Sequence, residues 1–282
     1  MREFLLGSPL SPALNPGAGP AQTTIAASEN GVVHLDRLQV AAIASSEQVG
    51  YSGFDLTEML EVNNLLVNGS IELIRGRNNP GAPGSVFSPL RETPVIKLGD
   101  WAFGTGDTVA MNAQIQGTGP INGAFTIAAP FTPRNKRLGY TGAIPAVRQT
   151  YAGAQAQAIG PGGNAPVTIT FDQDGVADLN SLVVSCGYDA LVNGVTPYEQ
   201  LASSLVQQIT LPSGDQLILG QGVFGVSSLI FSATRAGNWW SPGFEFVSAG
   251  SQIQILVVNA GTQNGSYTAG LPFYPSSKGG IC

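Results

Sequence analysis

The chain has 282 residues and a formal net charge of −6, with 43% hydrophobic and only 11% charged residues. Ordinary soluble domains carry charge on about a quarter of their residues, so this composition predicts a surface built for association with neighbouring molecules. Twelve Lys and Arg residues are too few to neutralise many phosphates, so we expect no direct contact with nucleic acid. The apolar runs are too short for a membrane-spanning helix, and the N-terminus lacks the apolar stretch of a secretion signal, which favours cytoplasmic synthesis.

Residues 1–14 contain the apolar run Phe4, Leu5 and Leu6, followed by a glycine and two prolines. These breakers oppose a regular helix or a central strand. We therefore predict an extended N-terminal arm. Its three apolar side chains are candidates for an interface with a neighbouring subunit, or for contact with an internal membrane.

Residues 15–133 form the first predicted domain. Apolar and polar residues alternate over 108–115, which indicates a half-buried strand, and turn signals recur at the spacing typical of an antiparallel sandwich or barrel. Asp55 and Glu58 form a capping box, which predicts a short helix over 56–64. The pair Asn68-Gly69 then favours a hairpin turn.

The chain then repeats itself. Residues 31–40 and 175–184 share five of ten residues, and 122–133 and 264–275 share six of twelve. A second capping box, Thr196 to Glu199, predicts an equivalent helix over 197–206. We therefore predict a linker at 134–159, a second homologous domain at 160–275 and a C-terminal tail at 276–282.

This arrangement resembles a known family. The predicted chain has two tandem β-domains, each with a short capped helix that leads into a strand and a hairpin. It resembles the double jelly-roll major capsid proteins of corticovirus-like bacteriophages, which are tailless, membrane-containing and icosahedral. The local resemblance is best over residues 194–218 and their counterpart 54–71. It implies an all-β fold of two tandem homologous jelly-roll β-barrels, each with one short helix.

The resemblance also implies a function. The chain would be the major coat subunit of a virion, a structural viral protein that forms pseudo-hexameric homotrimers and tiles an icosahedral shell. Its partners would be other copies of itself, neighbouring capsomers, minor capsid or penton proteins and internal membrane lipids. The alternative is a tandem β-sandwich carbohydrate-binding or adhesin module, such as a virion spike.

Few residues suggest catalysis. The one histidine, His34, lies within an alternating strand pattern, so we predict a solvent-facing structural residue rather than the base of a hydrolase. Residues 220–225 match the dinucleotide fingerprint in form only, because a strand pattern follows where a helix is needed. Cys186 and Cys282 show neither metal-ligand nor disulfide spacing. We expect no enzymatic activity and no organic cofactor.

Two further motifs leave alternatives open. Asp172, Asp174 and Asp178 resemble part of a calcium loop, but the other copy keeps the turn without the charges, so a β-turn is favoured over a structural Ca²⁺ site. Trp239 and Trp240 could form a sugar platform, although such residues more often close a barrel end or lie in a subunit interface. The basic cluster at 134–137 could contact lipid headgroups or belong to a solvated linker.

Overall fold

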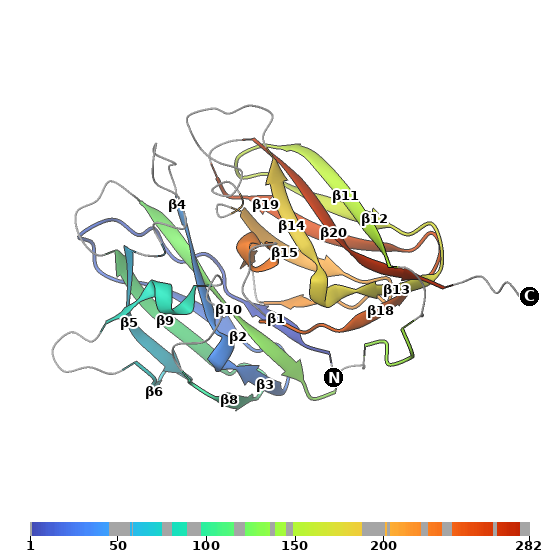
Figure 1. The fold of residues 1–282 in the computed structure, drawn as a ribbon. Helices are drawn as coiled ribbons and strands as arrows, with labels where there is room; N and C mark the ends of the chain where they lie inside the picture. Colours follow the sequence, from blue (N-terminus) through green and yellow to red (C-terminus); the bar gives the residue numbers. More distant parts are fainter. Residues whose placement is uncertain are drawn as a thin grey trace, which may run out of the picture.

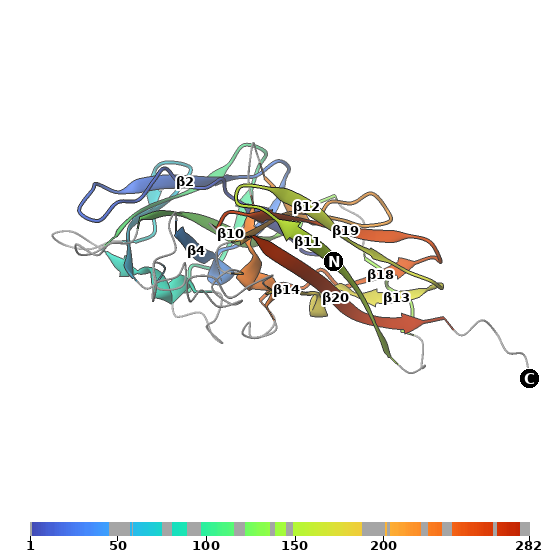
Figure 2. The same ribbon diagram turned by 90° about the horizontal axis from the view of Figure 1, so that it is seen from above.

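The computed structural model describes residues 2–44, 57, 59–74, 81–88, 97–115, 122–135, 139–144, 149–187, 201, 204–220, 225–232, 239–261 and 264–276. Most of these residues belong to two β-barrels that lie side by side (Figure 1, Figure 2). Barrel 1 comprises the described residues up to 135, drawn blue to green, and barrel 2 those from 149 onward, drawn lime to red. No helix within the described ranges is long and apolar enough to cross a bilayer.

Barrel 1 consists of two facing sheets. The first has the order β1 (Phe4–Gly7), β10 (Gly123–Pro133), β3 (Gly31–His34) and β8 (Asp100–Phe103), and β4 (Gln39–Ala44) also pairs with β10. The second has the order β2 (Ala21–Ala26), β9 (Thr108–Ile115), β5 (Leu60–Val67) and β6 (Ile71–Glu72), and β7 (Ala82–Pro83) also pairs with β5. Two 3₁₀ helices connect strands, η1 (Leu35–Arg37) and η2 (Gly84–Phe87).

Barrel 2 repeats this arrangement. One sheet has the order β11 (Thr150–Ile159), β20 (Gly265–Pro275), β13 (Gly175–Asp178) and β18 (Phe244–Val247), with β14 (Val183–Gly187) on β20. The other has the order β12 (Asn164–Thr170), β19 (Gln252–Asn259), β15 (Ser204–Thr210) and β17 (Val226–Ser227). The 3₁₀ helices are η3 (Leu179–Ser181) and η4 (Ser228–Phe231). The remaining strand of barrel 2, β16 (Ile218–Leu219), follows β15 and pairs with β1 of barrel 1.

The strand order in each barrel is that of a jelly roll. The first strand pairs with the last, and the main strands alternate between the two sheets, in the chain order β1, β2, β3, β5, β8, β9, β10 in barrel 1 and β11, β12, β13, β15, β18, β19, β20 in barrel 2. Even the irregularities recur, because a β-bulge lies between Val62 and Asn64 on β5 and at the equivalent place, between Val206 and Gln208, on β15. The predicted all-β fold of two tandem homologous jelly rolls is therefore confirmed.

The alternation of side chains in the sequence fills the core of each barrel. In β19, for example, Ile253, Ile255 and Val257 are buried whereas Gln252 and Gln254 are exposed. Aromatic residues from both sheets close the interior, as where Phe171 packs against Phe273 with ring centroids 5.2 Å apart. Period-two patterning thus places one apolar face of each sheet inward.

The predicted hairpin at Asn68-Gly69 is present between β5 and β6. Both residues have positive φ, 51° and 66°. Two consecutive positive φ angles define the type I′ turn, whose twist matches that of paired strands.

The predicted helices are shorter at their C-terminal ends than expected. Both capping boxes lie outside the described residues, and Thr57, Met59 and Leu201 are helical. Strands β5 and β15 begin at Leu60 and Ser204, so the predicted helix ends at 64 and 206 are wrong. The apolar side chains that follow each helix repeat every two residues, which suits a strand, and this period rather than any breaker ends the helix.

Two segments predicted to lie outside the barrels contain strands. Residues 4–7, expected within an arm, form β1, and residues 150–159, expected within the linker, form β11. Each pairs antiparallel with the last strand of its barrel, β10 or β20. The two segments are thus equivalent first strands, and the glycine and prolines after Leu6 end a strand instead of preventing one.

Candidate interaction surfaces

Strand β1 joins the two barrels. On one edge it pairs antiparallel with β10 of barrel 1, and on the other it pairs parallel with β16 of barrel 2, where Leu5 lies opposite Ile218. The backbone N–H of Leu5 donates to the carbonyl oxygen of Leu217 over 2.8 Å. A single four-residue strand therefore belongs to both barrels and fixes their relative position (Figure 1).

The apolar run that was predicted to bind a neighbouring subunit is buried within its own chain. Phe4, Leu5 and Leu6 are all 0% exposed. Phe4 and Leu6 lie opposite core residues of β10, whereas Leu5 faces barrel 2. The prediction that these three side chains bind a neighbouring subunit or a membrane is therefore wrong. Phe4 and Leu6 are buried in barrel 1 and Leu5 against barrel 2, because β10 and β16 offer the two edges with which this strand pairs.

Arg2, just before β1, binds groups of barrel 2. Its guanidinium donates to the backbone oxygens of Pro242 and Phe244, at 3.2 and 2.9 Å, and to the carboxylate of Glu245 at 2.5 Å. The carboxylate of Asp215 lies 3.7 Å away. The Arg2 side chain is only 2% exposed, so its charge is satisfied almost wholly by these groups of barrel 2. Buried guanidinium groups require such partners.

Glu3 links the barrels through a second set of polar contacts. Its carboxylate accepts two hydrogen bonds from the guanidinium of Arg37 in barrel 1, at 2.7 and 3.0 Å, and one from the backbone N–H of Ser241 in barrel 2, at 2.9 Å. Arg37 also donates to the carbonyl oxygen of Trp239 at 3.1 Å. One carboxylate is thus shared between groups of both barrels.

Trp239 and Trp240 belong to this junction. The indole N–H of Trp240 donates to the carbonyl oxygen of Glu3 at 3.1 Å, and its ring packs edge-on against Phe231. The indole N–H of Trp239 donates to the carbonyl oxygen of Arg37. Trp240 is buried and Trp239 half-buried, so they form no open sugar platform. They do lie in an interface, which joins the two barrels of one chain.

The polar contacts of the junction were not predictable from local sequence patterns. No sequence pattern predicts a contact for Arg2, Glu3 or Arg37, because an isolated Arg or Glu is normally a solvated side chain. The available signal was the scarcity of charge: where few residues are charged, an Arg-Glu pair next to an apolar run is unusual. Their partners lie more than 30 residues away along the chain, so no local motif connects them.

His34 is half-buried beside the junction rather than solvent-facing as predicted. Its two ring nitrogens contact the carboxylate of Asp100 at 2.8 Å and the hydroxyl of Thr132 at 2.9 Å. These neighbours come from β8 and β10, which flank β3 in the sheet. The histidine therefore ties three adjacent strands together.

The three aspartates of the calcium candidate have separate structural contacts. Asp178 precedes η3 and accepts hydrogen bonds from the backbone N–H of Asn180 and the hydroxyl of Ser181. Asp174 accepts from the backbone N–H of Ala249 at 2.8 Å, and Asp172 lies in the same turn. The described residues contain no cluster of three or more acidic, His or Cys side chains arranged to hold a metal ion.

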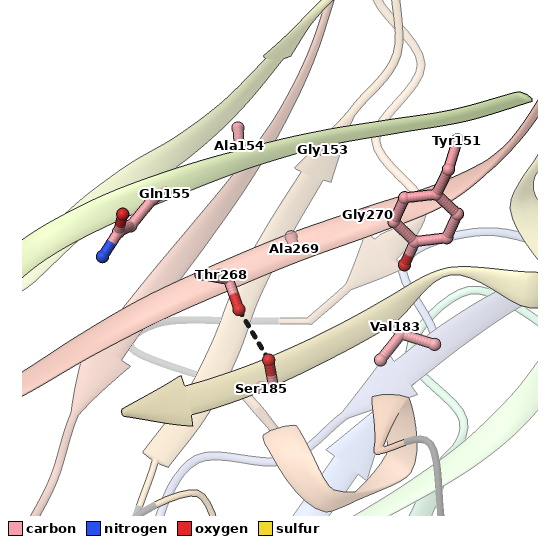
Figure 3. A pocket seen from close by; sticks show the side chains of 9 residues that line it. All are labelled: Tyr151, Gly153, Ala154, Gln155, Val183, Ser185, Thr268, Ala269 and Gly270. Atoms are coloured by element: carbon pink, nitrogen blue, oxygen red, sulfur yellow. Dashed lines mark hydrogen bonds between the residues drawn. The ribbon is translucent and has the colours of Figure 1, made fainter. Parts of the chain in front are cut away.

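A hollow of about 420 Å³ lies on the outer face of barrel 2 (Figure 3). Neighbouring strands β11, β20 and β14 form its floor, and the hydroxyls of Ser185 and Thr268 are hydrogen-bonded across it at 2.6 Å. Tyr151 is 64% exposed, and desolvation of its phenol raises the pKa of this group above the usual value. The hollow is lined by Tyr151, Gly153, Ala154, Gln155, Val183, Ser185, Thr268, Ala269 and Gly270.

The fold and the junction define a double jelly-roll protein whose barrels share an edge strand. Solved structures similar to this chain include the major capsid protein P2 from bacteriophage PM2, with 8% identity, 99% of this chain and 100% of that chain covered and a TM-score of 0.26. Another is the STIV MCP, with 11% identity, 98% and 97% coverage and a TM-score of 0.26.

A third similar structure is a chain of Sulfolobus Turreted Icosahedral Virus, with 9% identity, 98% of this chain and 91% of that chain covered and a TM-score of 0.25. No protein-family model matches the sequence, and no curated protein matches it.

Proposed function

We propose that this chain is the major coat subunit of an icosahedral virion. The observation that carries the proposal is the contact between the barrels. Two homologous barrels meet through different surfaces, the β1 edge of barrel 1 and the β16 edge of barrel 2. A contact between unlike surfaces of like units can continue from unit to unit and close into a ring. A repeated barrel joined in this way suits the assembly of a shell.

Three copies would supply six barrels to one ring, which gives a pseudo-hexameric homotrimer. Such a capsomer packs against similar capsomers in a closed shell, and vertices would need other proteins. The low charge of the chain, 11% of residues, supports a surface that is largely covered in the assembly. The role is structural and non-enzymatic, and the mature protein would reside in the virion. Internal membrane lipids remain proposed partners of the inner surface.

The carbohydrate-binding alternative has less support. Its best candidates, Trp239 and Trp240, make hydrogen bonds that hold the two barrels together. A sugar platform needs aromatic faces open to solvent. The exposed aromatic residues Tyr151 and Phe246 lie on opposite edges of their sheet, on β11 and β18, and so form no single platform.

The native mass in solution tests the proposal. We expect mass photometry and light scattering of the purified chain to give three times the 29.1 kDa chain mass. Electron microscopy of concentrated trimer, with or without the other virion proteins, should show flat hexagonal plates or shells. A monodisperse monomer up to tens of micromolar would overturn the trimer, and binding of glycans with no self-assembly would favour the spike alternative.

A further inference from the structure

The contact between the barrels exists only once in a chain, but each of its two surfaces is present twice. On barrel 1, the outer face of β1 and β10 is covered by β16 and β17 of barrel 2. Leu5 lies beside Ile218, and an added Cβ on Gly7 would lie 3.1 Å from a methyl group of Val226. We call the covered surface of barrel 1 the acceptor face, and the surface that covers it, around β16 and β17, the donor face.

Barrel 2 has its own acceptor face, and this face is open. The register of β11 on β20 places Tyr151 opposite Pro272, as that of β1 on β10 places Leu5 opposite Pro130. Tyr151 is thus equivalent to Leu5, and Gly153 to Gly7. Their exposures differ sharply, because Leu5 is 0% and Tyr151 64% exposed. The hollow in Figure 3 lies on this open face.

The edge of β11 is also open in the described part of the chain. β11 is the last strand on its side of the sheet, whereas the equivalent β1 continues into β16. Proline has no N–H, so the residue opposite it belongs to a pair whose backbone groups point away from each other. Leu5 uses its outward N–H to bind Leu217, and Tyr151 presents the same group at the edge of β11.

Barrel 1, in turn, has an unused donor face. Leu73 donates to the carbonyl oxygen of Leu65 at 2.8 Å just as Leu217 donates to that of Ile209 at 2.9 Å. Ala82 of β7 lies opposite Val62 as Val226 of β17 lies opposite Val206. Residues 71–74 and β7 are therefore equivalent to the β16 region and β17.

Exposure again separates the two copies of the donor face. Leu217 and Val226 are both buried at 0%, whereas their equivalents Leu73 and Ala82 are half-buried. Ile71, at the tip of the same segment, is 43% exposed. The donor face of barrel 1 thus lacks the cover that barrel 1 itself gives to the donor face of barrel 2.

We propose that the open acceptor face of barrel 2 binds the donor face of barrel 1 from a second copy of this chain. Residues 73–74 of the second copy would add to β11 as a parallel strand, and the carbonyl oxygen of its Leu73 would accept a hydrogen bond from the backbone N–H of Tyr151. Ala82 of the second copy would lie over Gly153. The occupant is a second copy because the two open faces are equivalents of two faces that already bind each other. The inference rests on the proposed coat function and specifies its subunit interface.

The sequence contains a further correspondence. Arg148 stands two residues before β11, as Arg2 stands two residues before β1. Arg2 binds backbone oxygens of the adjoining barrel. The side chain of Arg148 lies outside the described residues, so this correspondence is one of sequence position only, but it extends the equivalence of the two acceptor faces to the residue before each strand.

A substitution at Gly153 tests the interface without disturbing the barrel. An added Cβ there would come no closer than 3.4 Å to any neighbour within the chain, so Gly153→Arg should fold, with an unchanged circular dichroism spectrum. In the assembly the side chain would collide with the second copy. We expect the dissociation constant of the oligomer to rise by about 100-fold or more. The matched control is Phe246→Arg, on the far edge of the same sheet, which should leave assembly unchanged.

A crosslink gives the positive test. In a chain with Cys186→Ser and Cys282→Ser, the pair Gly153→Cys and Ala82→Cys should form disulfides between copies, because the equivalent Gly7 and Val226 are in contact. Non-reducing electrophoresis should show linked dimers and trimers. The pair Gly153→Cys and Phe246→Cys should give neither.

The outcomes separate this inference from the proposed function. If Gly153→Arg still forms a trimer and the Gly153→Cys, Ala82→Cys chain forms no crosslink, the interface is overturned but the coat function is kept. A crosslinked ladder that continues beyond three copies supports the interface and overturns the closed trimer. A wild-type chain that stays monomeric, together with a Gly153→Cys, Ala82→Cys chain that forms no crosslink, overturns both.

Discussion

Arg2 and Glu245 form an ion pair at 2.5 Å although 243 residues separate them in the chain. The guanidinium belongs to the segment that begins barrel 1, and the carboxylate to strand β18 of barrel 2. Both side chains are almost completely removed from solvent, at 2% and 10% exposed. The segment that begins barrel 1 therefore completes barrel 2, which has its full set of contacts only when Arg2 is in place.

Removal of Arg2 should destabilise the chain strongly. Arg2→Met leaves the Glu245 carboxylate buried without its partner, and such changes cost about 3–5 kcal/mol in the free energy of unfolding. Urea unfolding followed by tryptophan fluorescence would measure the loss. The control is Arg134→Met at an exposed side chain, which should change stability by less than about 0.5 kcal/mol.

The double variant Arg2→Met with Glu245→Met tests whether the two charges are coupled. Replacement of a buried ion pair by apolar residues is often close to neutral. We therefore expect the double variant to regain most of the stability that Arg2→Met loses. If the double variant is only as stable as the sum of the two single changes predicts, the two side chains act independently.

The repeat and the strand alternation were enough to predict two β-domains, because both are local patterns. The roles of the N-terminus were not predictable in this way. Whether Phe4, Leu5 and Leu6 bind their own chain or a neighbour depends on pairing with β10 and β16, more than 100 residues away. The match of Arg148 and β11 to Arg2 and β1 places the start of each repeat earlier than the predicted domain starts at residues 15 and 160.

Leu5 should be the most sensitive apolar residue of the junction. It is fully buried between the barrels, so Leu5→Ala should lower the free energy of unfolding by about 2–5 kcal/mol through lost contacts and a cavity. Leu10→Ala removes the same atoms from a side chain that is 41% exposed and should cost far less. Small-angle scattering would show whether the barrels also move apart. Equal effects of the two variants in denaturant unfolding would contradict a buried junction.

Calcium should have little effect on stability. The carboxylate of Asp174 already accepts a hydrogen bond from the backbone N–H of Ala249, and that of Asp178 accepts from the backbone N–H of Asn180 and the hydroxyl of Ser181. A ligand that binds only the folded state raises the melting temperature, so millimolar CaCl₂ and EDTA should give the same thermal midpoint. A calcium-dependent rise that disappears in Asp172→Asn would revive the calcium loop and show that these contacts rearrange around an ion.

The glycine that begins β3 and β13 is required for close packing of the sheet. A Cβ added to Gly175 would lie 2.5 Å from the ring of Phe273, and one added to the equivalent Gly31 would lie 2.4 Å from the ring of Phe131. Both separations are far shorter than a van der Waals contact, so either the ring or the strand must move. The identity of this glycine in the two copies therefore has a physical reason in the packing of an aromatic ring against the backbone.

Gly175→Ala should consequently lower the free energy of unfolding by about 1–3 kcal/mol, the usual cost of overpacking a core. The matched control is Gly19→Ala, because nothing lies within 4 Å of a Cβ added there and its φ is ordinary. That change should be neutral or slightly stabilising, since alanine restricts the unfolded chain. Parallel thermal and urea unfolding of the two variants would measure the difference. The carbonyl oxygen of Tyr274 also lies 2.5 Å from the added Cβ, so a Gly175→Ala chain as stable as Gly19→Ala would mean that both the Phe273 ring and the β20 backbone can shift, and that this close packing is not required for the fold.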